Sequence, residues 1–246
     1  MRVALVTGAA GGIGSATIRR LLRDDYAVVA LDRRPEVSAL TDELAGQHVV
    51  PVVADVRDRD ALEGAVAAAV DTFGRLDAAV AAAAVVAGGQ PLWETEPAVY
   101  EDILDIDTLG VWNTAAAVVP SMLAGPDPSG CRFVAVASAA AHQGLFGLAA
   151  YNVAKHGVVG LVKGLAADLV GTGVTAAAVS PGSTNTPMLE ATADIYGLPG
   201  VELFASHQLL RRLIEPDEVA AAIAFCCSRE GAVINGSVVH AGGGFS

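Results

Sequence analysis

Short apolar runs alternate along this chain with longer, alanine-rich stretches. The runs are rich in valine and lack polar alternation, which is typical of parallel strands that are covered on both faces. They predict seven strands, at residues 3–7, 27–31, 49–54, 78–83, 133–137, 174–179 and 237–240. Helices are predicted between them, at residues 13–24, 58–73, 98–123, 152–170 and 216–228.

Repeated alternation of strand and helix predicts an α/β protein with a doubly wound parallel sheet and helices on both faces. No linker, repeat or low-complexity block interrupts the pattern. The breaks at residues 125–130 and 181–182 contain proline and glycine and fit surface turns. We therefore predict a single domain over residues 1–246.

Composition and charge exclude several classes of partner. The chain is 53% hydrophobic, with a net charge of −12 and a pI near 4.7, which argues against nucleic acid or an anionic membrane as the main partner. Its apolar runs are too short to span a bilayer, and its N-terminus does not read as a signal peptide. Three cysteines, two of them adjacent, fit neither a disulfide framework nor a zinc site. We expect a cytoplasmic protein without a metal.

The first predicted strand runs directly into the glycine-rich sequence TGAAGGIG at residues 7–14. Its spacing, G-x-x-x-G-x-G, differs from the G-x-G-x-x-G of the usual dinucleotide fingerprint. However, it lies between a strand and a helix, where glycines let the backbone approach a pyrophosphate and the helix N-terminus supplies free N–H donors. The sequence therefore predicts a dinucleotide site in a Rossmann-type fold.

Asp32 ends the second predicted strand, eighteen residues beyond Gly14. A carboxylate at this position can accept hydrogen bonds from the adenosine ribose hydroxyls and would repel a 2′-phosphate. Arg33 and Arg34 follow it, and a guanidinium could hold that phosphate instead. Because the glycine loop itself contains no basic residue, we expect NAD rather than NADP.

Tyr151 and Lys155 stand four residues apart in a chain that contains only two lysines. Side chains four apart lie on one face of a helix. A phenol titrates near pH ~10, and an ammonium one turn away favours the phenolate, so the pair suits proton transfer at neutral pH. Ser138 ends the fifth strand, where sheets of this type place their ligands.

These motifs together resemble the classical short-chain dehydrogenase/reductase family: TGAAGGIG, Ser138, YNVAK at 151–155 and the PG of 181–182. The resemblance implies that Tyr151 is the general acid/base, that Lys155 lowers its pKa and binds the nicotinamide ribose, and that Ser138 polarises the substrate oxygen. It also implies a homotetramer joined through the long helices at 98–123 and 152–170. The cofactor contacts that it implies are Gly8, Gly11, Gly12, Ile13, Gly14, Asp32, Arg33, Asp55, Val56, Ala82, Ala83, Tyr151, Lys155, Pro181, Gly182, Thr184 and Thr186.

Two positions depart from the family pattern. Residues 81–84 are four alanines where the family has NNAG, so no side-chain amide braces the sheet there. Counting back from Gly110, the usual catalytic asparagine falls on Asp107. Asp107 would keep the relay to Lys155, but its charge would also stabilise the ammonium and offset part of its effect on Tyr151.

The segment after Thr186 predicts a helical lid at about residues 187–205, whose Met188 and Tyr196 are candidate substrate contacts. His142, in the loop after Ser138, is a further candidate. The expected function is NAD-dependent interconversion of an apolar secondary alcohol and its ketone. The alternatives are an NADPH-dependent ketoreductase for carrier-bound acyl groups and a non-catalytic dinucleotide sensor. Residues 81–97 also resemble the branch of the family associated with mycofactocin, which would make that redox peptide an electron acceptor.

Overall fold

The computed structural model describes residues 1–44 and 46–245, and within them seven strands form one parallel sheet. The strand order is β3-β2-β1-β4-β5-β6-β7, so the chain reverses its direction of winding between β1 and β4. This confirms the predicted doubly wound sheet. The strands are β1 (Arg2–Thr7), β2 (Tyr26–Asp32), β3 (Val49–Val53), β4 (Ala78–Ala81), β5 (Arg132–Val136), β6 (Thr175–Pro181) and β7 (Val238–Ala241).

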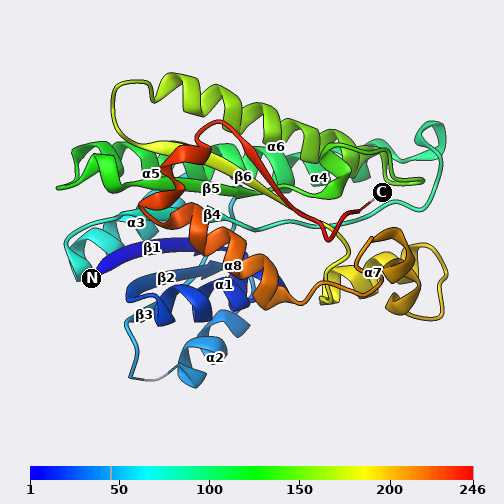
Figure 1. The fold of residues 1–246 in the computed structure, drawn as a ribbon, viewed down its shortest axis with the longest axis horizontal. Coiled ribbons are helices and arrows are strands. Elements are labelled where there is room, and N and C mark those ends of the chain that lie inside the picture. Colours follow the sequence, from blue (N-terminus) through cyan, green and yellow to red (C-terminus); the bar gives the residue numbers. More distant parts are fainter. Residues whose placement is uncertain (45, 246) are drawn as a thin grey trace.

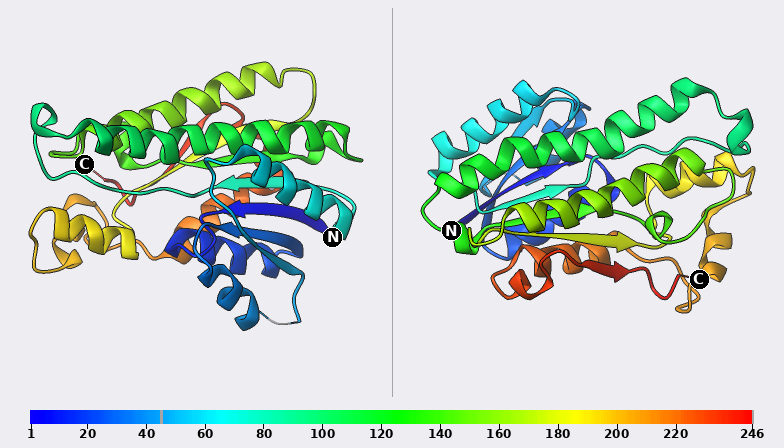
Figure 2. Two further views of the ribbon diagram at one scale, coloured as in Figure 1. Left: turned by 180° about the vertical axis from the view of Figure 1, so that it is seen from behind. Right: turned by 90° about the horizontal axis from the view of Figure 1, so that it is seen from above.

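Helices cover both faces of the sheet (Figures 1 and 2). One face carries α3 (Arg59–Phe73), α5 (Gly110–Ala124) and α6 (Ala149–Asp168), with α4 (Pro97–Leu104) packed on α6. The other face carries α1 (Gly12–Arg23), α2 (Glu36–Glu43) and α8 (Pro216–Cys227). Each layer encloses its own apolar core, which explains why the central strands read as continuous apolar runs.

Two helical features differ from the prediction. The sequence analysis did not predict α2, a short helix after Pro35 that buries only Val37, Leu40 and Thr41. The helix predicted at 98–123 is interrupted by a π-helical turn, Asp105–Leu109. Within this turn Thr108 Oγ1 donates to the Ala154 carbonyl of α6 at 3.1 Å, so contacts with a neighbouring helix accompany the wider winding.

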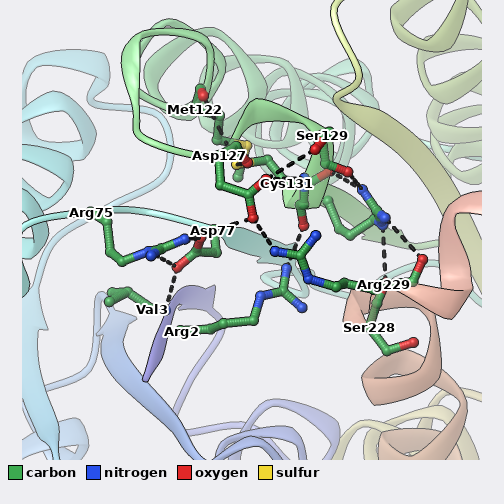
Figure 3. Close-up of polar contacts among 12 residues, drawn as sticks. Arg2, Val3, Arg75, Asp77, Met122, Asp127, Ser129, Cys131, Ser228 and Arg229 are labelled. Atoms are coloured by element: carbon green, nitrogen blue, oxygen red, sulfur yellow. Dashed lines mark hydrogen bonds and ion pairs between the residues drawn. The ribbon is translucent and has the colours of Figure 1, made fainter.

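The amino-terminal edge of the sheet is closed by a polar cluster (Figure 3). Arg75 pairs with the buried carboxylate of Asp77, which also accepts a hydrogen bond from the Val3 N–H at 2.8 Å. Arg132 is 3% exposed and donates to four backbone carbonyls, those of Ser129, Cys131, Ser228 and Arg229. This cluster ties β5 to the end of α8 at the edge opposite the α7 segment.

In the described part of the chain, every helix is too short or too polar to cross a membrane. The three cysteines are free and buried.

Candidate active site

A cavity of about 860 Å³ opens at the carboxyl ends of the strands. It runs from the Asp32 end of β2, past the glycine-rich turn, to Tyr151 and α7 (Pro187–Ile195). This is the point where the strand order reverses, the usual ligand position in open α/β sheets. All the predicted site residues line this cavity except Asp107 and His142: Gly8, Gly11, Gly12, Ile13, Gly14, Asp32, Arg33, Asp55, Val56, Ala82, Ala83, Ser138, Tyr151, Lys155, Pro181, Gly182, Thr184, Thr186, Met188 and Tyr196.

Two glycines of the turn between β1 and α1 lie where a side chain would meet neighbouring atoms. Gly8 has a φ of +68°, and a Cβ there would lie 2.7 Å from the backbone of Ala82 and Ala83. A Cβ on Gly12 would lie 2.6 Å from Cγ2 of Thr186, across the cavity. Gly11 caps the N-terminus of α1 without a side-chain hydrogen bond, so the first N–H groups of the helix stay available. Such a turn fits a pyrophosphate.

Carboxylates line the end of the cavity beyond this turn, next to β2 and β3. Asp32 is 6% exposed, and its Oδ2 accepts a hydrogen bond from the Ala10 N–H at 2.9 Å. Its Oδ1 accepts from the backbone N–H of Arg34 at 2.9 Å and pairs with the Arg34 side chain at 3.3 Å. Asp55 lies further along the same wall, where a hydrogen bond from Arg57 lowers the pKa of its carboxyl.

The segment after β6 closes the opposite wall. Thr186 caps the N-terminus of α7 by accepting a hydrogen bond from the Leu189 N–H at 3.3 Å. Its hydroxyl in turn donates to the Thr184 carbonyl at 3.1 Å. These two hydrogen bonds hold the start of α7 in place opposite the glycine turn.

Ser138, Tyr151 and Lys155 meet at the inner end of the cavity. Ser138 follows β5 and caps a single 3-10 turn by accepting from the Ala140 N–H. Tyr151 and Lys155 lie on the first turns of α6, with Nζ 5.5 Å from the centre of the tyrosine ring. Both side chains are buried, at 8% and 2% exposed, so charge on either is little screened by water.

Asp107 lies behind this group rather than in the cavity. It is fully buried in the π-helical turn, with Oδ2 3.2 Å from Lys155 Nζ and Oδ1 accepting from the Val85 N–H at 2.8 Å. The wider winding of the turn thus accompanies a side chain that reaches the lysine. Lys155 also donates to the Val136 carbonyl at 3.4 Å. Burial raises the pKa of the Asp107 carboxyl, while the adjacent Lys155 ammonium and the Val85 N–H act against that rise and favour the ionised form.

The contacts among these residues shift the pKa values of Tyr151 and Lys155. Burial raises the pKa of the Tyr151 phenol above its usual value; Lys155 and the Ser138 hydroxyl act in the opposite direction, and Asp107 adds to the rise. Burial alone would lower the pKa of Lys155, but Asp107 and Tyr151 outweigh it and raise that pKa. Lys155 therefore stays an ammonium, and its field at Tyr151 is partly cancelled by Asp107.

The outer part of the cavity is apolar and aromatic. Tyr196, after α7, donates from Oη to the Phe146 carbonyl at 2.6 Å and so joins the predicted lid to the loop before α6. Tyr196, Phe204, His207 and Phe245 follow one another with ring centres 6.2–6.3 Å apart. The sequence analysis did not single out His207 or Phe245, because nothing local marks residues that reach the cavity only through the fold.

His142 does not line this cavity. It lies beside His240 of β7, with ring centres 4.5 Å apart, in a smaller adjoining cavity. His142, predicted to contact the substrate, is therefore not positioned to do so in the main cavity. Over residues 1–44 and 46–245, no three His, Cys, Asp or Glu side chains gather as metal ligands would.

Residues 8–246 match the family model described as enoyl-(acyl carrier protein) reductase. The A-factor type gamma-butyrolactone 1'-reductase (1S-forming) of Streptomyces virginiae is 38% identical, over 100% of this chain and 95% of the relative. The chain belongs to the classical short-chain dehydrogenase/reductase family. Another family member, the cis-4-hydroxycyclohexanecarboxylate dehydrogenase of Sinomonas cyclohexanicum, is 34% identical over 100% of this chain and 96% of the relative.

Solved structures of the family superpose over nearly the whole chain. Levodione reductase has a TM-score of 0.92 at 30% identity, with 99% of this chain and 96% of that chain covered. The 3-ketoacyl-(acyl-carrier-protein) reductase of Brucella melitensis, complexed with NADH, has a TM-score of 0.88 at 28% identity, with 99% and 97% covered. This protein is thus an oxidoreductase of a family whose fold neighbours bind nicotinamide dinucleotides.

Proposed function

We propose that this protein interconverts a secondary alcohol and its ketone with NAD, and that Tyr151 is its general acid/base. The observation that carries the proposal is the meeting of Ser138, Tyr151 and Lys155 at the inner end of a cavity whose other end carries Asp32. When bound, NAD supplies the hydride acceptor for alcohol oxidation. The glycine turn fits its pyrophosphate, and Asp32 fits the adenosine ribose.

Each side chain of the inner group then has a distinct task. Ser138 donates a hydrogen bond to the oxygen of the substrate and holds it against Tyr151. The Tyr151 phenolate accepts the hydroxyl proton as the alcohol becomes a ketone, and returns it in the reverse direction. Lys155 stabilises the phenolate through its charge, while Asp107 positions the lysine.

The outer cavity favours an uncharged, ring-containing or branched substrate. Its aromatic and aliphatic lining offers no arginine or lysine to a carboxylate near the lid, where the ionisable side chains among the described lining residues are Tyr196 and His207. Two relatives that act on ring compounds by name support a ring-containing substrate: the butyrolactone reductase and the cyclohexanecarboxylate dehydrogenase, although the substrate named for the second also carries a carboxylate.

The test is oxidation of a panel of alicyclic and aliphatic secondary alcohols with NAD and NADP, followed by absorbance of the reduced cofactor. We expect NAD-linked activity that Tyr151→Phe abolishes. Tyr100→Phe, at a tyrosine on α4 that is 43% exposed, is the matched control and should retain it. Equal activity of Tyr151→Phe and wild type would refute the assignment.

Residues 81–97, which resemble the mycofactocin-associated branch, carry a narrower proposal. The start of this segment forms one wall of the cavity, at Ala82–Val86. We propose that the protein holds NAD tightly and passes its electrons to mycofactocin without releasing the dinucleotide. Retention of NAD(H) by the purified protein through dialysis tests this directly. Complete loss of NAD(H) would contradict the proposed transfer of electrons to mycofactocin but would leave the proposed dehydrogenase activity intact.

The long helices support a homotetramer. Leu109, which ends the π-helical turn, Trp112, at the start of α5, and Val153, on α6, are 44%, 60% and 47% exposed. Large apolar side chains on the outer faces of two neighbouring segments are typical of a protein interface.

A further inference from the structure

A second cavity, of about 160 Å³, adjoins the active site. Ala139 and Phe245 line both cavities and therefore form the wall between them. The remaining wall comes from the turn that follows Ser138, the end of β6, and β7 with the chain that follows it. Its other lining residues are His142, Gln143, Ser180, His240, Gly242 and Gly244.

One buried polar group of this cavity, the Ser180 hydroxyl, lacks a hydrogen-bond partner in the described part of the chain. Ser180 is 2% exposed, and among residues 1–44 and 46–245 its hydroxyl has no hydrogen-bond partner. A buried hydroxyl without a partner is costly, and nearly all such groups in proteins bind something. His142 and His240 stand at the same cavity with ring centres 4.5 Å apart, inclined at 61°.

The histidines supply neutral hydrogen-bonding groups. Burial and the neighbouring His240 lower the pKa of His142, so its ring is uncharged at neutral pH. A neutral imidazole offers one donor and one acceptor, and the serine hydroxyl offers both. Both groups can donate to a carbonyl or hydroxyl oxygen, and neither carries the positive charge that would offset the desolvation of a carboxylate.

We propose that this second cavity is a distal subsite that binds a hydroxyl or carbonyl oxygen of the substrate through Ser180 and His142, with Phe245 as the movable partition. The proposal rests on the oxidoreductase function proposed above and narrows its substrate class. The preferred substrates are ketones or secondary alcohols that carry a second neutral oxygen function several bonds from the reacting carbon. The backbone of Phe245 is held by its carbonyl, which accepts a hydrogen bond from Gln143 Nε2 at 3.3 Å, and its ring lies beside that of His207.

The spacing fits a short chain between the two oxygens. Ser138 and His142 flank one 3-10 turn, which at a rise of about 2 Å per residue separates their Cα atoms by roughly 8 Å. Five carbon–carbon bonds of about 1.5 Å each span on the order of 6 Å when extended. We therefore choose a 2,7-dione, whose two oxygen functions have a comparable separation, as the probe.

The experiment compares 2-octanone with 2,7-octanedione, which have the same chain length. Two equivalent carbonyls alone give the dione a twofold advantage in kcat/KM. We expect about a twentyfold advantage in the wild type, the extra tenfold corresponding to about 1.4 kcal/mol. Ser180→Ala and His142→Ala should reduce the ratio toward two. The matched control, His156→Ala, removes a histidine of α6 outside both cavities and should keep the wild-type ratio.

A wild-type ratio near two, or one that neither variant lowers, would overturn the subsite while leaving the dehydrogenase assignment intact. Failure to reduce any ketone would count against the proposed function itself. Titration calorimetry then measures the affinity of the dione for the wild type and for Ser180→Ala, which tests the subsite independently of catalysis. Weaker binding by the variant supports it, and equal or absent binding refutes it.

Discussion

The Asp32 carboxylate is held by Arg34, through its backbone N–H at 2.9 Å and its side chain at 3.3 Å. The contact orients the carboxylate at the adenosine end of the cavity. It also offsets part of the negative charge that would repel a 2′-phosphate. We therefore expect the preference between NAD and NADP to depend on the balance between the Asp32 carboxylate and the guanidinium beside it.

The first prediction follows from that balance. Asp32→Ala should narrow the preference for NAD over NADP at least tenfold, about 1.4 kcal/mol, because the repulsive charge is lost and the arginine is freed. Arg34→Ala should widen it. Dissociation constants from tryptophan fluorescence quenching by NADH and NADPH measure both. Wild-type protein that binds NADPH as tightly as NADH would show that Asp32 does not select the cofactor.

The second prediction concerns the glycine turn. Gly8→Ala should abolish tight dinucleotide binding, because a Cβ there meets the backbone of Ala82 and Ala83 at 2.7 Å and the residue has a positive φ. Gly64→Ala is the control: Gly64 lies in α3 with open space around it, and alanine should stabilise that helix by about 0.5–1 kcal/mol. Calorimetry reports both changes. Unaltered NADH binding by Gly8→Ala would contradict the prediction.

Strands and catalytic motifs were predictable because their signals are local. Buried parallel strands leave continuous apolar runs, and Tyr151 and Lys155 share one helical turn. The π-helical turn was not predictable, since Asp105–Leu109 departs from an α-helix alongside contacts such as that of Thr108 with α6. The partnership of His142 with His240 was equally hidden, because nearly a hundred residues separate them and the pairing of β6 with both β5 and β7 brings them together.

A stability prediction concerns Arg132 at the amino-terminal edge of the sheet. Arg132→Met should destabilise the protein by about 3 kcal/mol or more, because four carbonyls lose their buried donor. For a chain of this length that corresponds to a Tm lower by roughly 6–12 °C. Arg229→Met, at a side chain that is 61% exposed, should cost about 1 kcal/mol or less. Equal Tm values for the two variants would show that the Arg132 contacts are not stabilising.

Assembly gives a fourth prediction. Wild-type protein should be a tetramer by light scattering at micromolar concentration, and Trp112→Glu should reduce the assembly by placing a charge in the interface. Val170→Glu, just beyond the end of α6, is the control for adding a surface charge. A monomeric wild type would contradict the expected seam between the long helices.

The last prediction tests Asp107, whose Oδ2 lies 3.2 Å from Lys155 Nζ. Asp107→Asn keeps the shape and the hydrogen bond from Val85 but removes the charge. The ammonium then acts on Tyr151 without compensation, so the pKa of the phenol should fall. Alcohol oxidation needs the phenolate, so its activity rises with pH through that pKa, and the rising limb of the kcat/KM profile should move to lower pH. One buried charge at this range is worth about 1 kcal/mol, or roughly half a unit to one unit. Activity should persist, because the lysine keeps its neighbours. A profile that stays in place or moves to higher pH would show that Asp107 does not influence the proton affinity of Tyr151.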